Sequence, residues 1–129
     1  MVKLDHINLS VKNLEESLNF YEELFDFKVV EQSEHKGKPY AIIKNGESML
    51  CMYEEERQMT PEESSAHKVY HFGLRVSDLD HWHNLLETTN VKVNLEWDYP
   101  HSKSWYISDP TGHEIEVCYW HNDQIRFGT

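Results

Sequence analysis

Two histidines and one glutamate have the residue types and the strand positions of a metal site. His6 and His71 stand 65 residues apart in two similar segments, and Glu116 lies in a third segment near the end of the chain. Two imidazoles and one carboxylate that meet in a water-accessible cavity leave open coordination positions for a substrate. This ligand set suits Fe²⁺, Mn²⁺, Ni²⁺ or Zn²⁺ rather than Ca²⁺. Glu114, two residues before Glu116, is the alternative carboxylate.

The first half of the chain predicts the elements that would position His6. Residues 4–11 alternate between apolar and polar side chains, so we expect a strand with His6 and Asn8 on one face. Asn13 can cap the helix that follows. The apolar stripe of this helix is Leu14, Leu18, Tyr21 and Phe25. Three strands are expected after it, at 27–30, 40–44 and 48–53, with a hairpin turn at the Asn-Gly pair 45–46.

The second half repeats this order of elements. A strand is predicted at 68–76, and Asp78 can cap a second helix with Leu79, Trp82 and Leu86 on its apolar face. Further strands are expected at 91–95, 104–107 and 114–120, with a turn at 109–112. At an offset of 65, His6, Val11 and Leu14 fall on His71, Val76 and Leu79. A shift to 66 places Gly46 on Gly112 and Leu50 on Glu116.

The repeat predicts an α+β protein made of tandem βαβββ modules. We expect one domain over 1–129, with module one at about 1–60, module two at about 67–129 and a polar linker at 54–66. Neither four-stranded sheet could bury both faces alone, so the helices should cover one face of each and the other faces should curve around a cleft. One alternative is an ordinary α+β sandwich in which the repeat is a coincidence. Another is a domain built from the repeat whose histidines and glutamate form an interior hydrogen-bond network.

The composition of the chain limits the kinds of molecule that it is expected to bind. The chain has 129 residues, with 23 acidic residues against 12 lysines and arginines and a formal charge of −11, which disfavours nucleic acid and anionic membrane surfaces. Two cysteines are too few for a disulfide framework. No basic leader or apolar stretch of membrane-spanning length is evident, so a cytoplasmic location is expected.

Three motifs carry a resemblance over almost the whole chain. They lie at 4–7 with 17–21, at 70–76, and at 109–116, where Asp-Pro-Thr-Gly-His-Glu-Ile-Glu follows an Asp-Pro-x-Gly-x-x-Ile-Glu pattern. The chain thereby resembles the vicinal oxygen chelate superfamily of glyoxalase I, bleomycin resistance proteins, extradiol dioxygenases and fosfomycin resistance enzymes. The last Glu of the pattern is a metal ligand there, which favours Glu116 over Glu114. The implied shared step is chelation of two substrate oxygens by a divalent metal.

The resemblance also implies roles for residues around the metal. Ser104 and Tyr106 match positions that hold the phosphonate in fosfomycin enzymes, but Asn8 replaces a threonine and Glu96 replaces a lysine. The nearest remaining cation is Lys103, in a short loop at 101–103. Arg75, on the cleft side of its strand, is a further candidate for substrate binding.

Comparison with the other subfamilies leaves the reaction open. Tyr106 lies ten residues before Glu116, as the catalytic Tyr of extradiol dioxygenases does, and His101 is our candidate acid and base. The fourth ligand of glyoxalase I is a Glu, but Leu50 stands at the aligned position. We therefore favour extradiol-type oxygenation or fosfomycin-type thiol transfer on a small molecule. The alternatives are a metal-free ligand-binding protein of the bleomycin-resistance type and a glyoxalase-like lyase or isomerase. A homodimer is implied by the resemblance.

Overall fold

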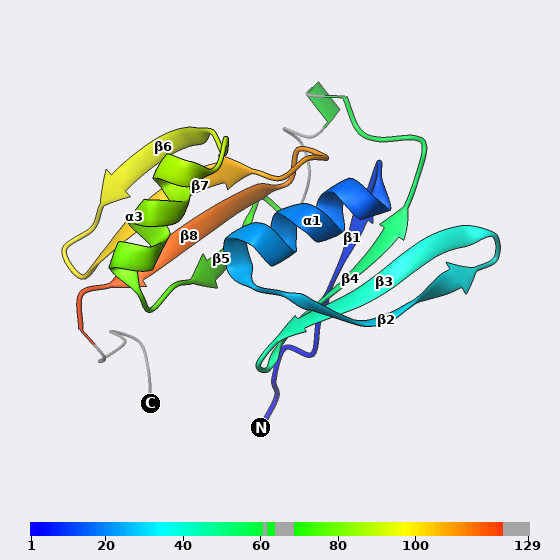
Figure 1. The fold of residues 1–129 in the computed structure, drawn as a ribbon, viewed down its shortest axis with the longest axis horizontal. Coiled ribbons are helices and arrows are strands. Elements are labelled where there is room, and N and C mark those ends of the chain that lie inside the picture. Colours follow the sequence, from blue (N-terminus) through cyan, green and yellow to red (C-terminus); the bar gives the residue numbers. More distant parts are fainter. Residues whose placement is uncertain (61, 64–68, 123–129) are drawn as a thin grey trace. The chain divides into compact units, whose positions relative to one another are not determined.

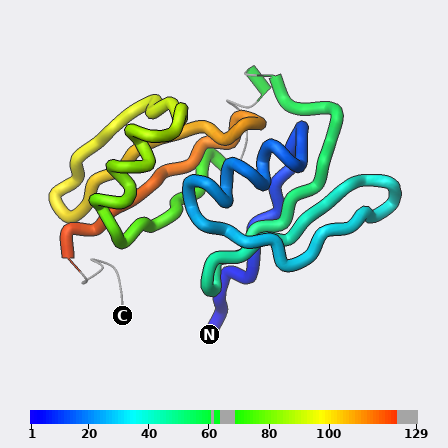
Figure 2. Tube along the Cα trace, in the orientation of Figure 1, coloured from blue at the N-terminus to red at the C-terminus, as the bar shows by residue number. Residues whose placement is uncertain are grey.

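The computed structural model describes residues 1–60, 62–63 and 69–122. The chain divides into two compact units, Met1–Ser64 and Ser65–Thr129. Each unit has the βαβββ order that the sequence predicts (Figures 1 and 2). The start predicted for module two, near residue 67, lies outside the described residues. Among the described helices, none is both long and apolar enough to cross a bilayer.

The first unit is one four-stranded mixed sheet with a helix packed on it. Its elements are β1 (Ile7–Val11), α1 (Leu14–Phe25), β2 (Lys28–His35), β3 (Lys38–Asn45) and β4 (Ser48–Glu54). The strand order is β1-β4-β3-β2, with β1 parallel to β4 and the other pairs antiparallel. The core lies between α1 and the sheet, where Leu9, Tyr21 and Ile43 are buried. The opposite face of β1 is exposed at Asn8.

Caps and turns fix the bounds of these elements. Asn13 Oδ1 accepts a hydrogen bond of 2.9 Å from Glu16 N, which confirms the predicted helix start. The β3–β4 hairpin is also confirmed, although its two-residue loop is Gly46 and Glu47, with Gly46 at a φ of 57°. Asn45 is the last residue of β3, and its amide donates to Phe25 O at 2.8 Å. The hairpin turn therefore also holds the end of α1.

The second unit repeats the architecture. Its elements are β5 (Phe72–Arg75), α3 (Leu79–Thr88), β6 (Val93–Asp98), β7 (Ser102–Ser108) and β8 (Glu114–Trp120). The strand order is β5-β8-β7-β6, with β5 parallel to β8. Asp78 Oδ1 accepts from His81 N at 3.0 Å, so this predicted cap is confirmed too. Trp82 of α3 packs edge-on against Trp105 of β7, with ring centroids 6.1 Å apart, and both are buried.

The strand registers correct one alignment between the two halves. Asn8 is opposite Cys51 in the first sheet, and Gly73 is opposite Glu116 in the second. The offset is 65 on both strands, so the counterpart of Glu116 is Cys51 and the prediction of Leu50 is wrong. The offset of 66 was taken from Gly46 and Gly112, but these glycines do not lie in equivalent loops. Gly46 lies in a two-residue loop, whereas Gly112 lies in the longer loop 109–113.

Candidate metal and substrate site

The two faces of the second sheet have opposite character. On β8, Ile115 and Val117 are fully buried, and Glu114 and Glu116 alternate with them on the other face. Residues that are paired across neighbouring strands share a face. Two rows of paired residues therefore lie on the face of Glu116, which we call the site face: Gly73, Glu116, Tyr106 and Leu95 in one row, and Arg75, Cys118, Ser104 and Trp97 in the next.

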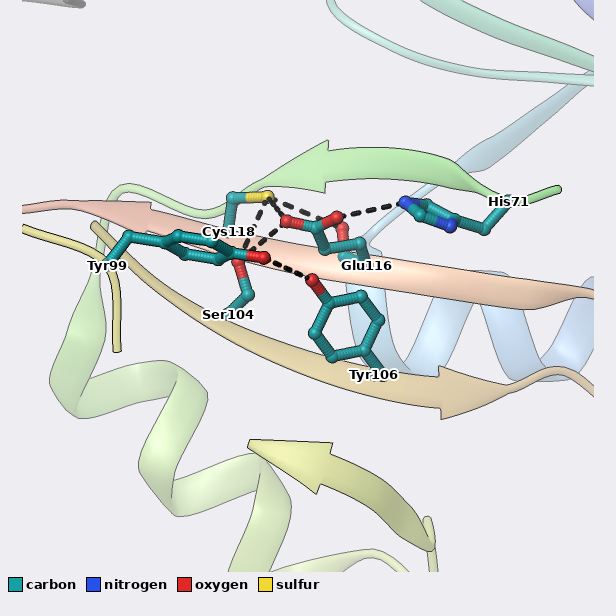
Figure 3. A network of polar contacts seen from close by, with 6 residues as sticks. All are labelled: His71, Tyr99, Ser104, Tyr106, Glu116 and Cys118. Atoms are coloured by element: carbon teal, nitrogen blue, oxygen red, sulfur yellow. Dashed lines mark hydrogen bonds and ion pairs between the residues drawn. The ribbon is translucent and has the colours of Figure 1, made fainter. Parts of the chain in front are cut away.

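Glu116 is the centre of the hydrogen bonds on the site face (Figure 3). Its Oε1 lies 2.9 Å from His71 Nε2, and its Oε2 accepts from Ser104 Oγ at 2.7 Å. Cys118 Sγ donates to the same Oε2 at 3.3 Å. The side chain of His71 is 30% exposed and that of Glu116 is 20% exposed, so both remain reachable from solvent. Of the two candidate carboxylates, Glu116 is the one that the described hydrogen bonds join to His71 and Ser104.

The surroundings keep Glu116 ionised and Cys118 protonated. Burial by itself would raise the pKa of the Glu116 carboxyl, but hydrogen bonds from Ser104, Cys118 and His71 lower the pKa below its ordinary value. Burial raises the pKa of the Cys118 thiol to about 11. At neutral pH the site therefore presents a carboxylate beside a neutral thiol, which is the protonation state that a carboxylate metal ligand requires.

The His71 and Glu116 donor atoms have a spacing that suits a shared metal ion. The distance between His71 Nε2 and Glu116 Oε1 is 2.9 Å. An imidazole nitrogen and a carboxylate oxygen are both donor atoms that divalent transition metals accept, so His71 and Glu116 could hold such an ion in place of this hydrogen bond. Within residues 1–60, 62–63 and 69–122, no group of three or more His, Cys, Asp or Glu side chains is arranged to hold a metal.

His6 and Asn8 belong to the first unit. His6 immediately precedes β1, and the strand registers make it the counterpart in the first unit of His71 in the second. The Nδ1 atom of His6 lies 2.7 Å from Asp5 Oδ2, and the His6 side chain is 42% exposed. In metal sites, a carboxylate at one ring nitrogen of a histidine orients the ring so that the other nitrogen binds the metal. Asn8 is exposed on the face of β1 away from α1. Both side chains are thus accessible within their own unit.

Tyr106 is hydrogen-bonded to a tyrosine that the sequence did not single out. The Tyr106 and Tyr99 hydroxyls are 2.9 Å apart (Figure 3), and the Tyr106 ring is perpendicular to the His71 ring, with centroids 5.8 Å apart. Burial, the Tyr99 hydroxyl and the charge of Glu116 raise the pKa of Tyr106 above its ordinary value, so it stays a hydrogen-bond donor. Tyr99 follows β6 directly. Because this strand was predicted to end at Leu95, no sequence pattern placed Tyr99 near the site.

His101 and Arg75 are held by a tryptophan of β8. The His101 ring stacks on Trp120 with centroids 4.6 Å apart, and its centroid is 6.1 Å from that of Tyr99. The Arg75 guanidinium lies 5.3 Å from the centre of the Trp120 ring. Arg75 therefore places a positive charge on the site face, and His101 lies in an aromatic stack at its margin.

The structure does not place Lys103 where the sequence predicted. Lys103 is a residue of β7 rather than of a loop, and alternation along the strand puts it opposite Ser104. Its Nζ lies 5.4 Å from the Trp105 ring centre, 3.7 Å from Glu96 and 3.9 Å from Asp98. Trp105 packs against α3, so Lys103 belongs to the helix side of the sheet. The loop position predicted for Lys103 is therefore wrong, and its part in substrate binding stays a prediction.

Comparison with known proteins identifies the family. Residues 3–117 match the family described as the Glyoxalase/Bleomycin resistance protein/Dioxygenase superfamily, and the chain belongs to it. This confirms the resemblance to the vicinal oxygen chelate proteins that the motifs indicated.

Three relatives illustrate the match. The chain is 28% identical to the metallothiol transferase FosB of Staphylococcus saprophyticus subsp. saprophyticus, over 88% of this chain and 74% of that protein. It is 28% identical to the glutathione transferase FosA of Serratia marcescens, over 88% of this chain and 78% of that protein. A solved structure of a FosX variant from Listeria monocytogenes, complexed with Mn(II) and 1S,2S-dihydroxypropylphosphonic acid, matches with a TM-score of 0.76 at 16% identity, over 93% of each chain. The last similarity is one of fold.

Proposed function

We propose that the chain is a divalent-metal-dependent thiol transferase that binds a small substrate through two oxygens. The observation that carries the proposal is the hydrogen-bonded pair of His71 and ionised Glu116, whose donor atoms are 2.9 Å apart. His6 is the third ligand in this proposal, supported by its position in the repeat. The names of FosA and FosB, both thiol-dependent transferases, support the reaction type.

Each residue of the site has a defined part in this scheme. A bound Fe²⁺, Mn²⁺, Ni²⁺ or Zn²⁺ would supply a Lewis acid that polarises the two substrate oxygens. Ser104 holds Glu116 Oε2, which leaves Oε1 directed at the position between Glu116 and His71. Tyr106 keeps its proton and donates a hydrogen bond to a substrate oxygen, while Tyr99 orients its hydroxyl.

Three further residues contact the substrate or move a proton in the proposal. Arg75, held against Trp120, faces a negatively charged oxygen of the substrate. Asn8 offers an amide, and His101 is the candidate base that takes the proton of the attacking thiol. A homodimer is proposed on the family resemblance, and light scattering of the purified protein measures the oligomeric state. The cytoplasmic location is proposed on the small number of cysteines.

Three other functions make different predictions. A glyoxalase-like isomerase needs a further carboxylate on the strand corresponding to β8, but Leu50, Cys51 and Met52 occupy that part of β4. Extradiol-type oxygenation is favoured by one observation, the cross-strand pairing of Tyr106 with Glu116. A metal-free binding protein would need no ionised carboxylate beside an imidazole.

The test is a pair of activity assays on one metal-loaded preparation. Protein reconstituted with Mn²⁺ is incubated with fosfomycin and glutathione, and conjugate formation is followed by mass spectrometry; oxygen uptake is measured with catechol. We expect conjugate formation that is abolished by EDTA and by Glu116→Gln, while Glu114→Gln retains it. Oxygen uptake without conjugate formation would contradict the proposal and indicate a dioxygenase. Tight fosfomycin binding without turnover would also contradict it and indicate a binding protein. The variant His6→Ala, which should lose metal affinity, tests the third ligand.

A further inference from the structure

Trp120 lies outside the core of the second unit, although it is a large apolar residue of β8. Alternation along the strand puts it on the site face with Glu116, opposite to buried Val117. The register pairs it with Ser102, the first residue of β7. The residue is only partly buried. Core packing therefore does not account for the position of this tryptophan.

Two candidate functional side chains contact the Trp120 ring from different elements. The Arg75 guanidinium carbon is 5.3 Å from the centre of the ring, within the range of a cation–π interaction. The His101 ring is 4.6 Å away between centroids, and the two ring planes are 28° apart. Arg75 ends β5 and His101 immediately precedes β7, and these strands lie on the two sides of β8 (Figure 1). One indole thus joins two polar side chains from strands that are not paired with each other.

Backbone hydrogen bonds hold the main chain of both partners against β8. Directly after Arg75, Val76 N donates to Cys118 O at 2.9 Å, and directly after Trp120, His121 N donates to His101 O at 3.1 Å. The freedom left to the two partners is that of their side-chain torsions, which contact with the indole restricts. Ordering one flexible side chain at the moment of binding reduces affinity by roughly two- to twelvefold, and a side chain that is already held avoids this loss.

The proposed metal pair lies at a distance from this contact along the same strands. Trp120 is four residues beyond Glu116 on β8, which is about 13 Å at about 3.3 Å per residue. Arg75 is likewise four residues beyond His71. A change of the Trp120 side chain should therefore leave the contact between His71 and Glu116 in place.

We propose that Trp120 is a positioning residue, which holds Arg75 for the negatively charged substrate oxygen and His101 for the proton of the thiol. This inference rests on the proposed function and adds to it a residue that acts through two others. Loss of the indole should release both side chains at once. Substrate binding should then weaken through Arg75 and turnover should slow through His101, while the metal stays bound.

The test is a pair of double-variant cycles on the Mn²⁺-loaded full chain with fosfomycin and glutathione. We expect Trp120→Leu to raise the KM for fosfomycin by about three- to tenfold, because Arg75 must then be ordered on binding. It should lower kcat by about tenfold, less than the factor of about 100 or more that a general base contributes. In an Arg75→Gln background the effect on KM should shrink to less than about twofold, and in a His101→Gln background so should the effect on kcat. Trp120→Phe should retain most of both parameters, because an aromatic face remains.

Metal content and a neighbouring variant separate positioning from a general disturbance of β8. Trp120→Leu should keep the wild-type Mn²⁺ stoichiometry, and Tyr119→Leu, on the opposite face of the same strand, should keep the wild-type KM and kcat. Equal effects of Trp120→Leu with and without Arg75→Gln or His101→Gln would overturn the inference, as would loss of Mn²⁺ together with activity. If the wild-type chain forms no conjugate, the proposed function fails and the positioning role fails with it.

Discussion

Removal of the Ser104 hydroxyl should weaken metal binding without touching a proposed ligand. Ser104 is buried, and its Oγ donates to Glu116 Oε2 at 2.7 Å. A hydrogen bond to a charged group contributes about 1.5–3 kcal/mol, which corresponds to roughly one to two pKa units. Ser104→Ala should therefore raise the pKa of Glu116 and allow the carboxyl to turn away from His71. Loss of such a supporting hydrogen bond typically costs about 10–100-fold in metal affinity.

Competition with a chromophoric chelator at neutral pH measures this effect. We expect the Kd for Mn²⁺ to rise by about 10–100-fold in Ser104→Ala, with an unchanged circular dichroism spectrum. Ser108→Ala is the matched control, because Ser108 is on the same strand and face but is paired with Glu114. Equal affinities in wild type and Ser104→Ala would refute the idea that this hydrogen bond holds the carboxylate in place for the metal.

Three further predictions follow from other contacts. The Asp109 carboxylate accepts hydrogen bonds from the backbone N–H groups of Thr111, Gly112 and His113 at 3.0, 2.9 and 2.8 Å. Asp109→Ala should therefore lower the free energy of unfolding, measured by urea titration, by about 1–3 kcal/mol. The control Asp98→Ala, at an exposed position, should lower it by far less. The hydrogen bonds that lower the pKa of Glu116 also stabilise the fold. This stabilisation is fully present above the ordinary carboxyl pKa of about 4.3 and is lost as pH falls through the lower pKa of the folded state. In Glu116→Gln the acid branch of a plot of melting temperature against pH should therefore be flatter, and an unchanged branch would contradict this prediction. Tyr99→Phe removes the partner of Tyr106 and should reduce kcat more than it changes KM; an effect on KM alone would argue against orientation of the Tyr106 hydroxyl.

Local signals predicted the architecture well because they act within a few residues. The caps at Asn13 and Asp78 and the β3–β4 hairpin are encoded by side chains that contact their own element. The ends of the strands were harder to predict. β2 was predicted at 27–30 but extends to His35, and every residue of it is exposed, so no apolar alternation marks its length.

The composition of the site could be predicted only in part. Glu116, Ser104 and Tyr106 share a face because alternation along a strand is a local property. The position of Lys103 depended on the start of β7, which begins two residues before the predicted strand and pairs there with β8. Tyr99 and Trp97 were missed because β6 carries its apolar residues away from the helix, the reverse of the pattern that a search for half-buried strands recognises.

Metal stoichiometry is the most direct test of the central claim that His71 and Glu116 hold a divalent ion. Wild-type protein, His71→Ala, Glu116→Ala and the control Glu114→Ala are equilibrated with Mn²⁺, freed of unbound metal on a desalting column and measured by mass spectrometry of the metal content. We predict retention of one ion per chain by wild type and Glu114→Ala, and loss of that ion in His71→Ala and Glu116→Ala. Equal metal content in wild type and Glu116→Ala would contradict the account.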